Sequence, residues 1–125
     1  TMKTKIMLTV LLLIVCACSA NSQERIKFKK GEYFTNIEGG VPRGEVYSYV
    51  VGASKGQFMT ITIMSPEDNA VFYILRTDNW QYMAGATEDN PTTRWEGTLP
   101  ANGDYEIVVG SNRGGAEYTL QVVIE

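Results

Sequence analysis

The 125-residue sequence contains no histidine and only two cysteines, Cys16 and Cys18, which lie near the start of the chain. The lack of histidine excludes Ser-His-Asp and Cys-His catalysis and all histidine-containing zinc sites. Because no cysteine follows residue 18, the rest of the chain can form neither an internal disulfide nor a cysteine nucleophile. We therefore expect a protein that binds and is not an enzyme, with no catalytic residue, cofactor or metal required for its fold.

The chain beyond residue 25 also lacks any window with helical spacing of apolar residues. Instead, apolar residues alternate with polar ones, as at Met59, Ile61 and Ile63, and turn residues interrupt the runs at short intervals. Since no helices are available to connect parallel strands, the pattern predicts an all-β fold, a single antiparallel β-sandwich of about seven or eight strands. We expect strands near residues 26–28, 35–41, 47–53, 59–63, 70–75, 95–99, 105–109 and 118–124.

Several local features refine this prediction. The segments 54–57, where Gly56 can adopt a positive φ, and 102–103, an Asn-Gly pair, are typical of β-hairpin turns. The run 70–75 is apolar on both faces, which indicates a central strand whose second face is covered by a loop or a partner. Residues 77–90 are expected to form a long connection with one short strand at 81–84. The lysines at positions 27, 29 and 30 are typical of a solvated edge strand.

The first twenty residues have the pattern of an export signal. Lys3 and Lys5 precede an uncharged stretch at 6–15, which is too short to span a bilayer as a helix. We predict a signal peptide at 1–20 and a mature domain at 21–125. The sequence around Cys18 resembles the bacterial lipobox, so Cys18 is the candidate lipidation site. Ordinary cleavage after Ala20 is the alternative.

These two alternatives predict different locations for an exported protein. With lipidation, Ser19 after the modified cysteine resembles the signal for the outer membrane, and 19–24 would be a short polar tether. With ordinary cleavage, the product would be periplasmic. The only expected membrane contact is the lipid anchor.

The charge balance excludes another class of partner. The sequence has 11 basic and 14 acidic residues. Lys3 and Lys5 would leave with the signal, so the mature part would carry nine basic and 14 acidic residues, a net charge of −5. Such a domain repels phosphate backbones, and the sequence contains no basic stripe, so we expect no nucleic-acid partner.

Four segments of the domain resemble the bacterial pre-peptidase C-terminal-like β-sandwich family. They are the turn and strand at 52–59, the Leu-Pro segment at 95–100, the Asn-Gly-Asp-Tyr segment at 102–105, and the final Tyr-Thr-Leu strand at 118–122. The resemblance extends over about residues 25–124. It implies a two-sheet β-sandwich.

Within that group, the segments 28–31 (Phe-Lys-Lys-Gly) and 99–105 (Leu-Pro-Ala-Asn-Gly-Asp-Tyr) resemble periplasmic inhibitors of goose-type lysozyme. The resemblance implies an extracellular or periplasmic protein partner, namely a lysozyme, and a loop that enters its cleft. It places the partner-binding residues at Asn102, Gly103, Tyr105 and Arg113. An arginine suits a catalytic carboxylate because its guanidinium offers five donors in a fixed fork.

Two other binding functions are compatible with the same sequence. A carbohydrate- or cell-wall-binding module could use Trp80, Tyr82 and Trp95 as stacking platforms, with Trp80 the exposed candidate because it lies in a polar segment. Calcium could be held by carboxylates at 67–69, 78–79 and 88–90 if these loops converge at one end of the sandwich. Turn chemistry also accounts for Asp and Asn at those positions.

Overall fold

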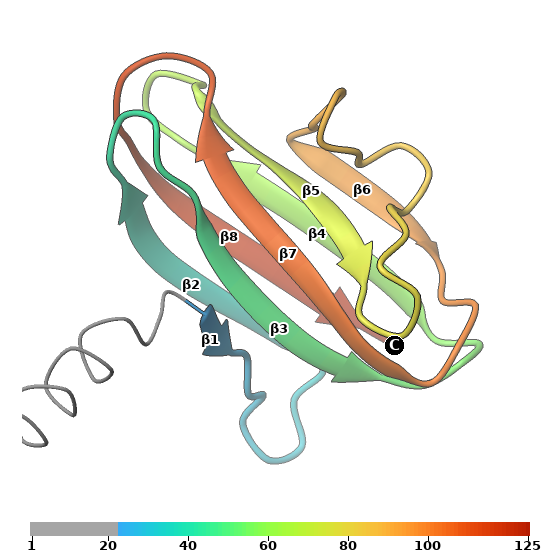
Figure 1. Cartoon of the computed structure of the whole chain (residues 1–125). Helices are drawn as coiled ribbons and strands as arrows, with labels where there is room; N and C mark the ends of the chain where they lie inside the picture. Colours follow the sequence, from blue (N-terminus) through green and yellow to red (C-terminus); the bar gives the residue numbers. More distant parts are fainter. Residues whose placement is uncertain (1–22) are drawn as a thin grey trace, which may run out of the picture.

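The computed structural model describes residues 23–125, which form two four-stranded β-sheets packed face to face (Figure 1). The predicted signal peptide at 1–20 and its Cys18 lie outside the described residues. No helix in the described part of the chain is long and apolar enough to cross a membrane. The predicted all-β sandwich is confirmed. The strands are β1 (Gln23–Arg25), β2 (Phe34–Val41), β3 (Tyr47–Ala53), β4 (Phe58–Met64), β5 (Ala70–Arg76), β6 (Arg94–Thr98), β7 (Gly103–Ser111) and β8 (Ala116–Ile124).

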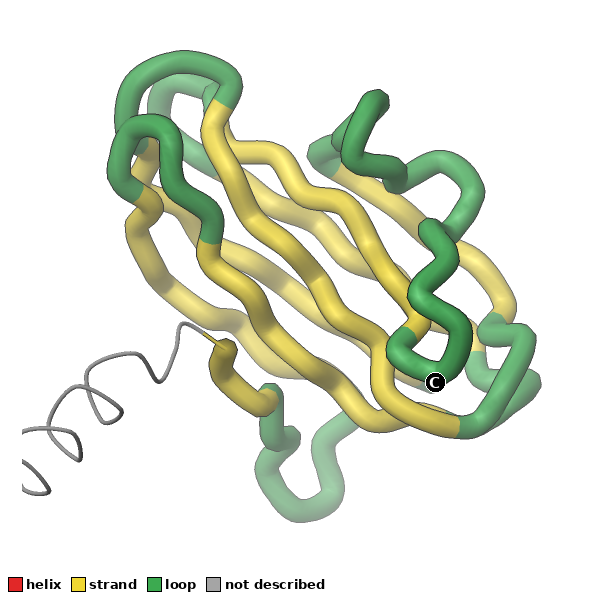
Figure 2. Tube along the Cα trace, in the orientation of Figure 1, coloured by secondary structure: helices red, strands yellow, loops and turns green. Residues whose placement is uncertain are grey.

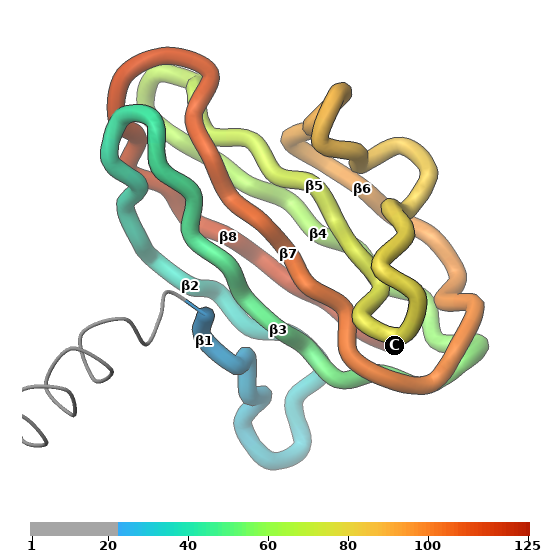
Figure 3. Tube along the Cα trace, in the orientation of Figure 1, coloured from blue at the N-terminus to red at the C-terminus, as the bar shows by residue number. Residues whose placement is uncertain are grey.

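The chain changes sheet at every connection. One sheet has the order β1-β3-β7-β5 and the other the order β2-β8-β4-β6, so odd-numbered and even-numbered strands occupy different layers. Five of the six strand pairs are antiparallel, and β1 pairs with β3 in parallel. Figure 3 shows successive strands passing back and forth between the two layers. No described strand pairs with its neighbour in sequence.

The two predicted hairpins are therefore wrong. Residues 54–57 lead from β3 in one sheet to β4 in the other, and residues 99–102 lead from β6 to β7 in the same manner. The predicted turn geometry is nevertheless present, since φ is +91° at Gly56 and +137° at Gly103. A glycine with positive φ reverses the chain, but it does not determine whether the next strand pairs with the last one or crosses the roughly 10 Å between sheets.

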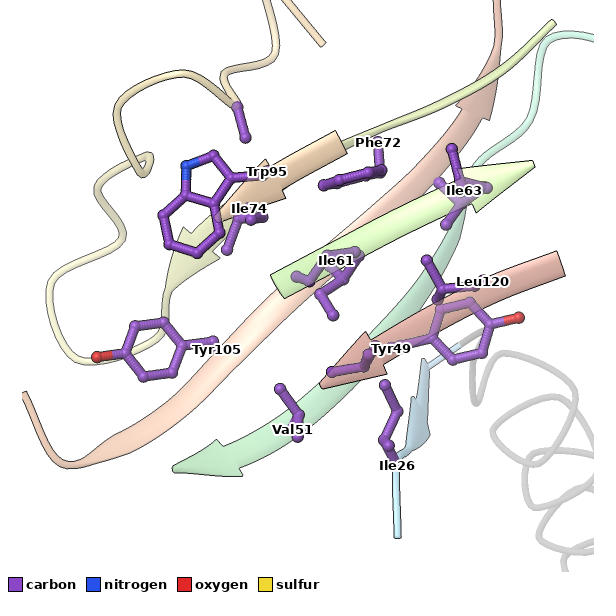
Figure 4. Packing of buried hydrophobic residues seen from close by; sticks show 14 of the residues in the cluster. Ile26, Tyr49, Val51, Ile61, Ile63, Phe72, Ile74, Trp95, Tyr105 and Leu120 are labelled. Carbon is purple, nitrogen blue, oxygen red and sulfur yellow. The ribbon is translucent and has the colours of Figure 1, made fainter. Parts of the chain in front are cut away.

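The core lies between the sheets and is built from one side chain in two along each inner strand. Met59, Ile61 and Ile63 of β4 all point inward, as their alternation predicts, and meet residues such as Ile74 and Leu120 (Figure 4). Trp95 of β6 is also buried, and its indole nitrogen donates a hydrogen bond to the Ala84 carbonyl at 2.9 Å. Trp95 is therefore a core residue and is not available as a stacking platform.

The strand β5 lies at the end of its sheet, whereas its apolar sequence predicted a central strand. The connection that follows it covers the exposed edge: the amide N–H groups of Phe72 and Ile74 donate to the carbonyls of Thr92 and Ala86, each at 2.9 Å. The expected cover lay over the second face of a central strand, whereas this loop pairs along the edge of β5. On the outer face, Tyr73 and Leu75 are only partly buried. The predicted short strand at 81–84 is reduced to isolated bridges, because this connection pairs with β5 at single residues only.

The first strand also differs from the prediction. Strand β1 covers Gln23–Arg25, and the lysines at 27, 29 and 30 follow it in an exposed connection instead of lying on an edge strand. The pairing with β3 ends after Ile26, whose amide donates to the Val50 carbonyl at 2.8 Å. Ile26 is buried in the core, and this inward turn of the chain ends the strand before the lysines.

A pair of tyrosines closes one side of the sandwich. The hydroxyls of Tyr49 on β3 and Tyr118 on β8 are 2.7 Å apart and buried, so the pair links the two sheets by a hydrogen bond. Gly39 on β2 lies opposite Tyr118. A Cβ at Gly39 would be 2.8 Å from the Tyr118 hydroxyl and 3.1 Å from that of Tyr49, so the absence of a side chain provides the space for the pair.

We predict that Gly39→Ala lowers the free energy of unfolding by about 1–3 kcal/mol, because the added methyl group overpacks the tyrosine pair. The neighbouring Gly40→Ala is the matched control, since a Cβ there meets nothing closer than the Ala116 carbonyl oxygen at 3.7 Å. Urea unfolding of both variants measures the difference. Equal losses for Gly39→Ala and Gly40→Ala would contradict the steric argument.

The same pair predicts a pH dependence. Burial raises the pKa of both the Tyr49 and the Tyr118 hydroxyl. In the unfolded chain these groups ionise near their ordinary pKa of about 10, whereas the folded protein holds their protons to higher pH, so stability falls as the pH rises above about 10. The double variant Tyr49→Phe/Tyr118→Phe should show a shallower loss in urea unfolding between pH 8 and pH 12. An unchanged slope would contradict this prediction.

Candidate functional site

Three connections meet at one end of the sandwich, which we call the three-loop end. They are residues 42–46 between β2 and β3, 65–69 between β4 and β5, and 112–115 between β7 and β8. Figure 2 shows these loops side by side, at the end away from the loops at 54–57 and 99–102. The three-loop end therefore presents parts of the chain that are far apart in sequence as one surface.

A buried asparagine holds two of these loops together. Asn69 is 2% exposed and is the one buried polar residue among those described. Its side-chain amide nitrogen donates to the carbonyls of Arg113 at 3.0 Å and Gly115 at 2.9 Å. The backbone carbonyl of Asn69 accepts a hydrogen bond from the backbone amide of Asn112 at 2.9 Å. A single residue thus supplies three hydrogen bonds to the loop at 112–115.

Two serine hydroxyls complete this arrangement. The Ser65 hydroxyl accepts hydrogen bonds from the amides of Asn69 and Ala70, each at 3.0 Å. The Ser111 hydroxyl donates to the Arg113 carbonyl at 2.9 Å. Both loops are therefore fixed in the isolated protein, and a partner that binds them would not need to order them first.

The two arginines of this end form no direct ion pairs with carboxylates of the described residues. Of the five arginines in the sequence, Arg25, Arg76 and Arg94 each form an ion pair. Within residues 23–125, the other two, Arg43 and Arg113, form none, and both are exposed on the three-loop end. The Arg113 guanidinium donates to the Glu67 carbonyl, which holds the side chain across the loop at 65–69. The remaining donors of its fork can still bind a carboxylate.

The surface around these arginines is acidic and partly apolar. The same loops and the start of β8 also carry exposed carboxylates, at Glu45, Glu67, Asp68 and Glu117. A shallow hollow of about 560 Å³ lies between the loops, and a second of about 520 Å³ lies next to it over β2 and β8. The rim also carries an exposed apolar side chain, Met64. Two exposed arginines, several exposed carboxylates and exposed apolar area suit the binding of a protein better than that of a small molecule.

The structure divides the predicted partner-binding residues between the two ends. Asn102 and Gly103 lie at the opposite end from Arg113, separated by the nine residues of β7, about 30 Å at roughly 3.3 Å per residue. The Asn102 side chain accepts a hydrogen bond from the Lys55 amide at 2.7 Å and so joins the loops at 99–102 and 54–57. Tyr105 is 2% exposed, and its hydroxyl donates to the Ala101 carbonyl at 2.7 Å.

The acidic loops do not converge in the way that the calcium hypothesis requires. Among residues 23–125, no group of three or more histidine, cysteine or acidic side chains is close enough to hold a metal ion. Within the segment 67–69, the side-chain amide of Asn69 donates hydrogen bonds to carbonyls of the neighbouring loop. Hydrogen bonding within the protein therefore accounts for this segment.

Sequence reasoning missed the role of Asn69. In the sequence it is one more turn residue before an apolar strand, and turn chemistry is a sufficient reason for an asparagine there. Its hydrogen-bond partners lie 44 and 46 positions further along the chain. No local pattern links residues at that separation, so only the folded structure identifies Asn69 as the brace.

We predict that Asn69→Ala lowers the free energy of unfolding by about 1–3 kcal/mol, because it removes two hydrogen bonds worth about 0.5–1.5 kcal/mol each and leaves the Gly115 carbonyl without its donor. It should also speed amide hydrogen exchange at 112–115. The control is Asn112→Ala, since the exposed Asn112 contributes only its backbone amide to these contacts. We expect that variant to stay within about 0.5 kcal/mol of the wild type. Equal effects of the two changes in urea unfolding and exchange would refute the brace.

Comparisons with known proteins identify the fold. No family model matches the sequence, and no curated protein matches it. Among solved structures, the chain is similar to Aeromonas hydrophila PliG, a periplasmic lysozyme inhibitor of g-type lysozyme, with a TM-score of 0.72 and 25% sequence identity over 83% of this chain and 96% of that one. It is also similar to Salmonella Typhimurium PliG, with a TM-score of 0.66 and 19% identity over 85% of this chain and 100% of that one.

The chain is also similar in fold to a pre-peptidase C-terminal domain. The pre-peptidase C-terminal domain of a collagenase from Bacillus anthracis has a TM-score of 0.57 and 15% identity over 85% of this chain and 97% of that domain. The resemblance predicted from the segments at 52–59, 95–105 and 118–122 is therefore confirmed at the level of the fold. Both PliG structures are matched over nearly their whole length, so this chain contains all of their sandwich.

Proposed function

We propose that this protein is a non-catalytic inhibitor of goose-type lysozyme that acts in the cell envelope, and that its three-loop end binds the enzyme. The observation that supports this function is the similarity of the whole sandwich to the two PliG inhibitors. The lack of histidine and the lack of cysteine after residue 18 support a role without catalysis. The predicted signal peptide at 1–20 supports export.

The geometry favours the three-loop end as the binding surface. Arg113 projects there from a loop that Asn69 holds in place, and it forms no ion pair with a carboxylate of residues 23–125. A lysozyme cleft carries catalytic carboxylates, and the guanidinium fork can bind such a group through two parallel hydrogen bonds. The surrounding carboxylates suit an enzyme whose outer surface is cationic, and they would speed association with it.

The opposite end is the alternative binding surface. Asn102, Gly103 and Tyr105 belong to the predicted contact set, but hydrogen bonds inside the protein engage both the Asn102 and the Tyr105 side chains. We propose that these residues position the loops at 54–57 and 99–102. In this view, Tyr105 and Asn102 stabilise the sandwich, and Arg113 makes the contact with lysozyme.

The location of the protein follows from the predicted leader. We propose that the mature protein is either anchored to the outer membrane through a lipid on Cys18 or released into the periplasm after cleavage at Ala20. Intact-mass measurement of the membrane fraction distinguishes the two forms. A diacylglyceryl-modified chain that begins at Cys18 supports the anchor, and an unmodified chain that begins at Asn21 supports release.

We predict that the mature protein inhibits goose-type lysozyme at micromolar concentration or below and that Arg113→Ala weakens inhibition about 30-fold or more. An arginine at the centre of an interface commonly contributes 2 kcal/mol or more to binding. The matched control is Asn102→Ala, which changes an exposed polar side chain at the other end and should alter inhibition less than about threefold. The same inhibition assay with chicken-type and invertebrate-type lysozymes measures the specificity of the protein for the goose type.

Each result has a distinct meaning. If Asn102→Ala weakens inhibition and Arg113→Ala does not, the contact lies at the opposite end, and our assignment of the surface is wrong. If the wild-type protein inhibits none of the three lysozyme types, the proposed function itself fails. Circular dichroism of each variant ensures that a loss of inhibition does not reflect a loss of fold.

A further inference from the structure

Trp80 is held in an exposed position by a strained backbone. It is 65% exposed, more than any other large apolar side chain that is exposed among the described residues. Its φ is +57°, in the left-handed region that bulky residues rarely adopt. The turn fixes this geometry, since the Trp80 amide donates to the Arg76 carbonyl at 2.9 Å. Such strain costs of order 1–3 kcal/mol and is concentrated in proteins at binding sites.

A small hollow lies beside this tryptophan on the outer face of the β1-β3-β7-β5 sheet. Its volume is about 230 Å³, and it is lined by Gln23, Arg25, Val50, Thr77, Trp80 and Asp104. Trp80 supplies an aromatic wall, and buried Val50 supplies apolar surface. The remaining lining residues are an amide, a guanidinium, a hydroxyl and a carboxylate. The hollow therefore combines one stacking surface with four hydrogen-bonding groups.

The polar groups of the hollow are already oriented. The Arg25 guanidinium binds the Asp104 carboxylate through two hydrogen bonds, at 2.7 and 3.2 Å. Thr77 is fixed by two hydrogen bonds to the Asp104 carbonyl, from its hydroxyl at 3.0 Å and from its amide at 3.2 Å. Arg25 and Asp104 both remain partly exposed, so the unused donors and lone pairs of this pair can reach a ligand.

We propose that this hollow, with Trp80 as its stacking wall, is a binding site for a neutral polysaccharide chain of the N-acetylhexosamine type, such as the glycan strand of peptidoglycan. A sugar ring presents an apolar face of C–H groups, which stacks on an aromatic ring, and a rim of hydroxyls, which both donate and accept hydrogen bonds. Planar side chains such as those of Arg25, Asp104 and Gln23 match adjacent hydroxyls on that rim. Ligand sites typically combine apolar walls with a small number of polar groups that point toward the ligand, as this hollow does.

The charges around the hollow make other ligands less suitable. Asp104 neutralises Arg25, and Gln23 donates to the carboxylate of Glu106 at 2.8 Å, so a second acidic group lies near the hollow. A nucleic acid or an anionic membrane would meet carboxylates here instead of an uncompensated cation. A neutral sugar pays no such electrostatic penalty.

The position of the site is compatible with the proposed inhibition. Asp104 is the second residue of β7, whereas Arg113 follows the end of that strand, so the hollow lies toward the end of the sandwich opposite the three-loop end. One molecule could therefore hold a glycan strand and a lysozyme at the same time. This last consequence rests on the proposed function, but the glycan site does not.

The test measures binding of the mature protein to purified insoluble peptidoglycan and to chitotriose. We expect cosedimentation with peptidoglycan, and we expect chitotriose to protect tryptophan fluorescence from iodide quenching. Since Trp95 is buried, the quenchable tryptophan is Trp80. Trp80→Gly removes this fluorophore, so its affinity for chitotriose is measured by calorimetry beside the wild type. Both that affinity and cosedimentation with peptidoglycan should fall at least tenfold. Glycine adopts positive φ readily, so this variant should melt no lower than the wild type.

Tyr33→Ala is the matched control, because Tyr33 is another exposed aromatic residue and does not line the hollow. It should bind both probes as the wild type does. The proposal is overturned if the wild type binds neither probe, or if Trp80→Gly binds as well as Tyr33→Ala. It is also overturned if Trp80 instead mediates binding to phosphatidylglycerol vesicles. Calorimetry with goose-type lysozyme alone should be unaffected by Trp80→Gly, which separates this site from the proposed inhibition.

Discussion

The structure depends on one constraint, namely that every connection between described strands passes from one sheet to the other. No strand can complete its hydrogen bonds with its neighbour in sequence, so each sheet forms only when strands distant in the chain come together. The two sheets and the core between them must therefore assemble as one unit. Topologies dominated by such distant pairings fold slowly, because loops must close before any pairing stabilises them.

The same constraint creates the two ends on which the functional surfaces lie. Except for the connection between β5 and β6, which runs along the edge of β5, the connections between layers lie at the ends of the sandwich, and polar side chains fix several of them there. Asn69 braces one end, whereas Asn102 and Tyr105 brace the other. Within residues 23–125, no buried side-chain nitrogen or oxygen lacks a hydrogen-bond partner. The loops are thus presented in a fixed arrangement, which suits a protein that acts by occupying the site of another.

Two surfaces of the molecule are shaped for contact, and they differ in chemistry. The three-loop end offers Arg113 without a carboxylate partner and a broad acidic rim, which suits a large cationic protein. The hollow at Trp80 is small and electrically balanced, with the aromatic wall and hydrogen-bonding groups that suit a sugar. Since both lie outside the core, either can change without disturbing the packing between the sheets.

The amino-acid sequence alone predicts the all-β class, the positions of most strands and the inward faces of strands such as β4, because alternation and turn residues are local properties. It also predicts Trp80 as an exposed aromatic. Strand partners, the sheet to which each strand belongs, the brace at Asn69 and the distance between Asn102 and Arg113 all depend on the folded chain. An Asn-Gly pair is equally compatible with a hairpin and with a crossing between sheets, and side-chain periodicity identifies a face but not the strand beside it. Contacts between residues far apart in sequence decide whether a turn forms a hairpin or a crossing, and which strands lie side by side.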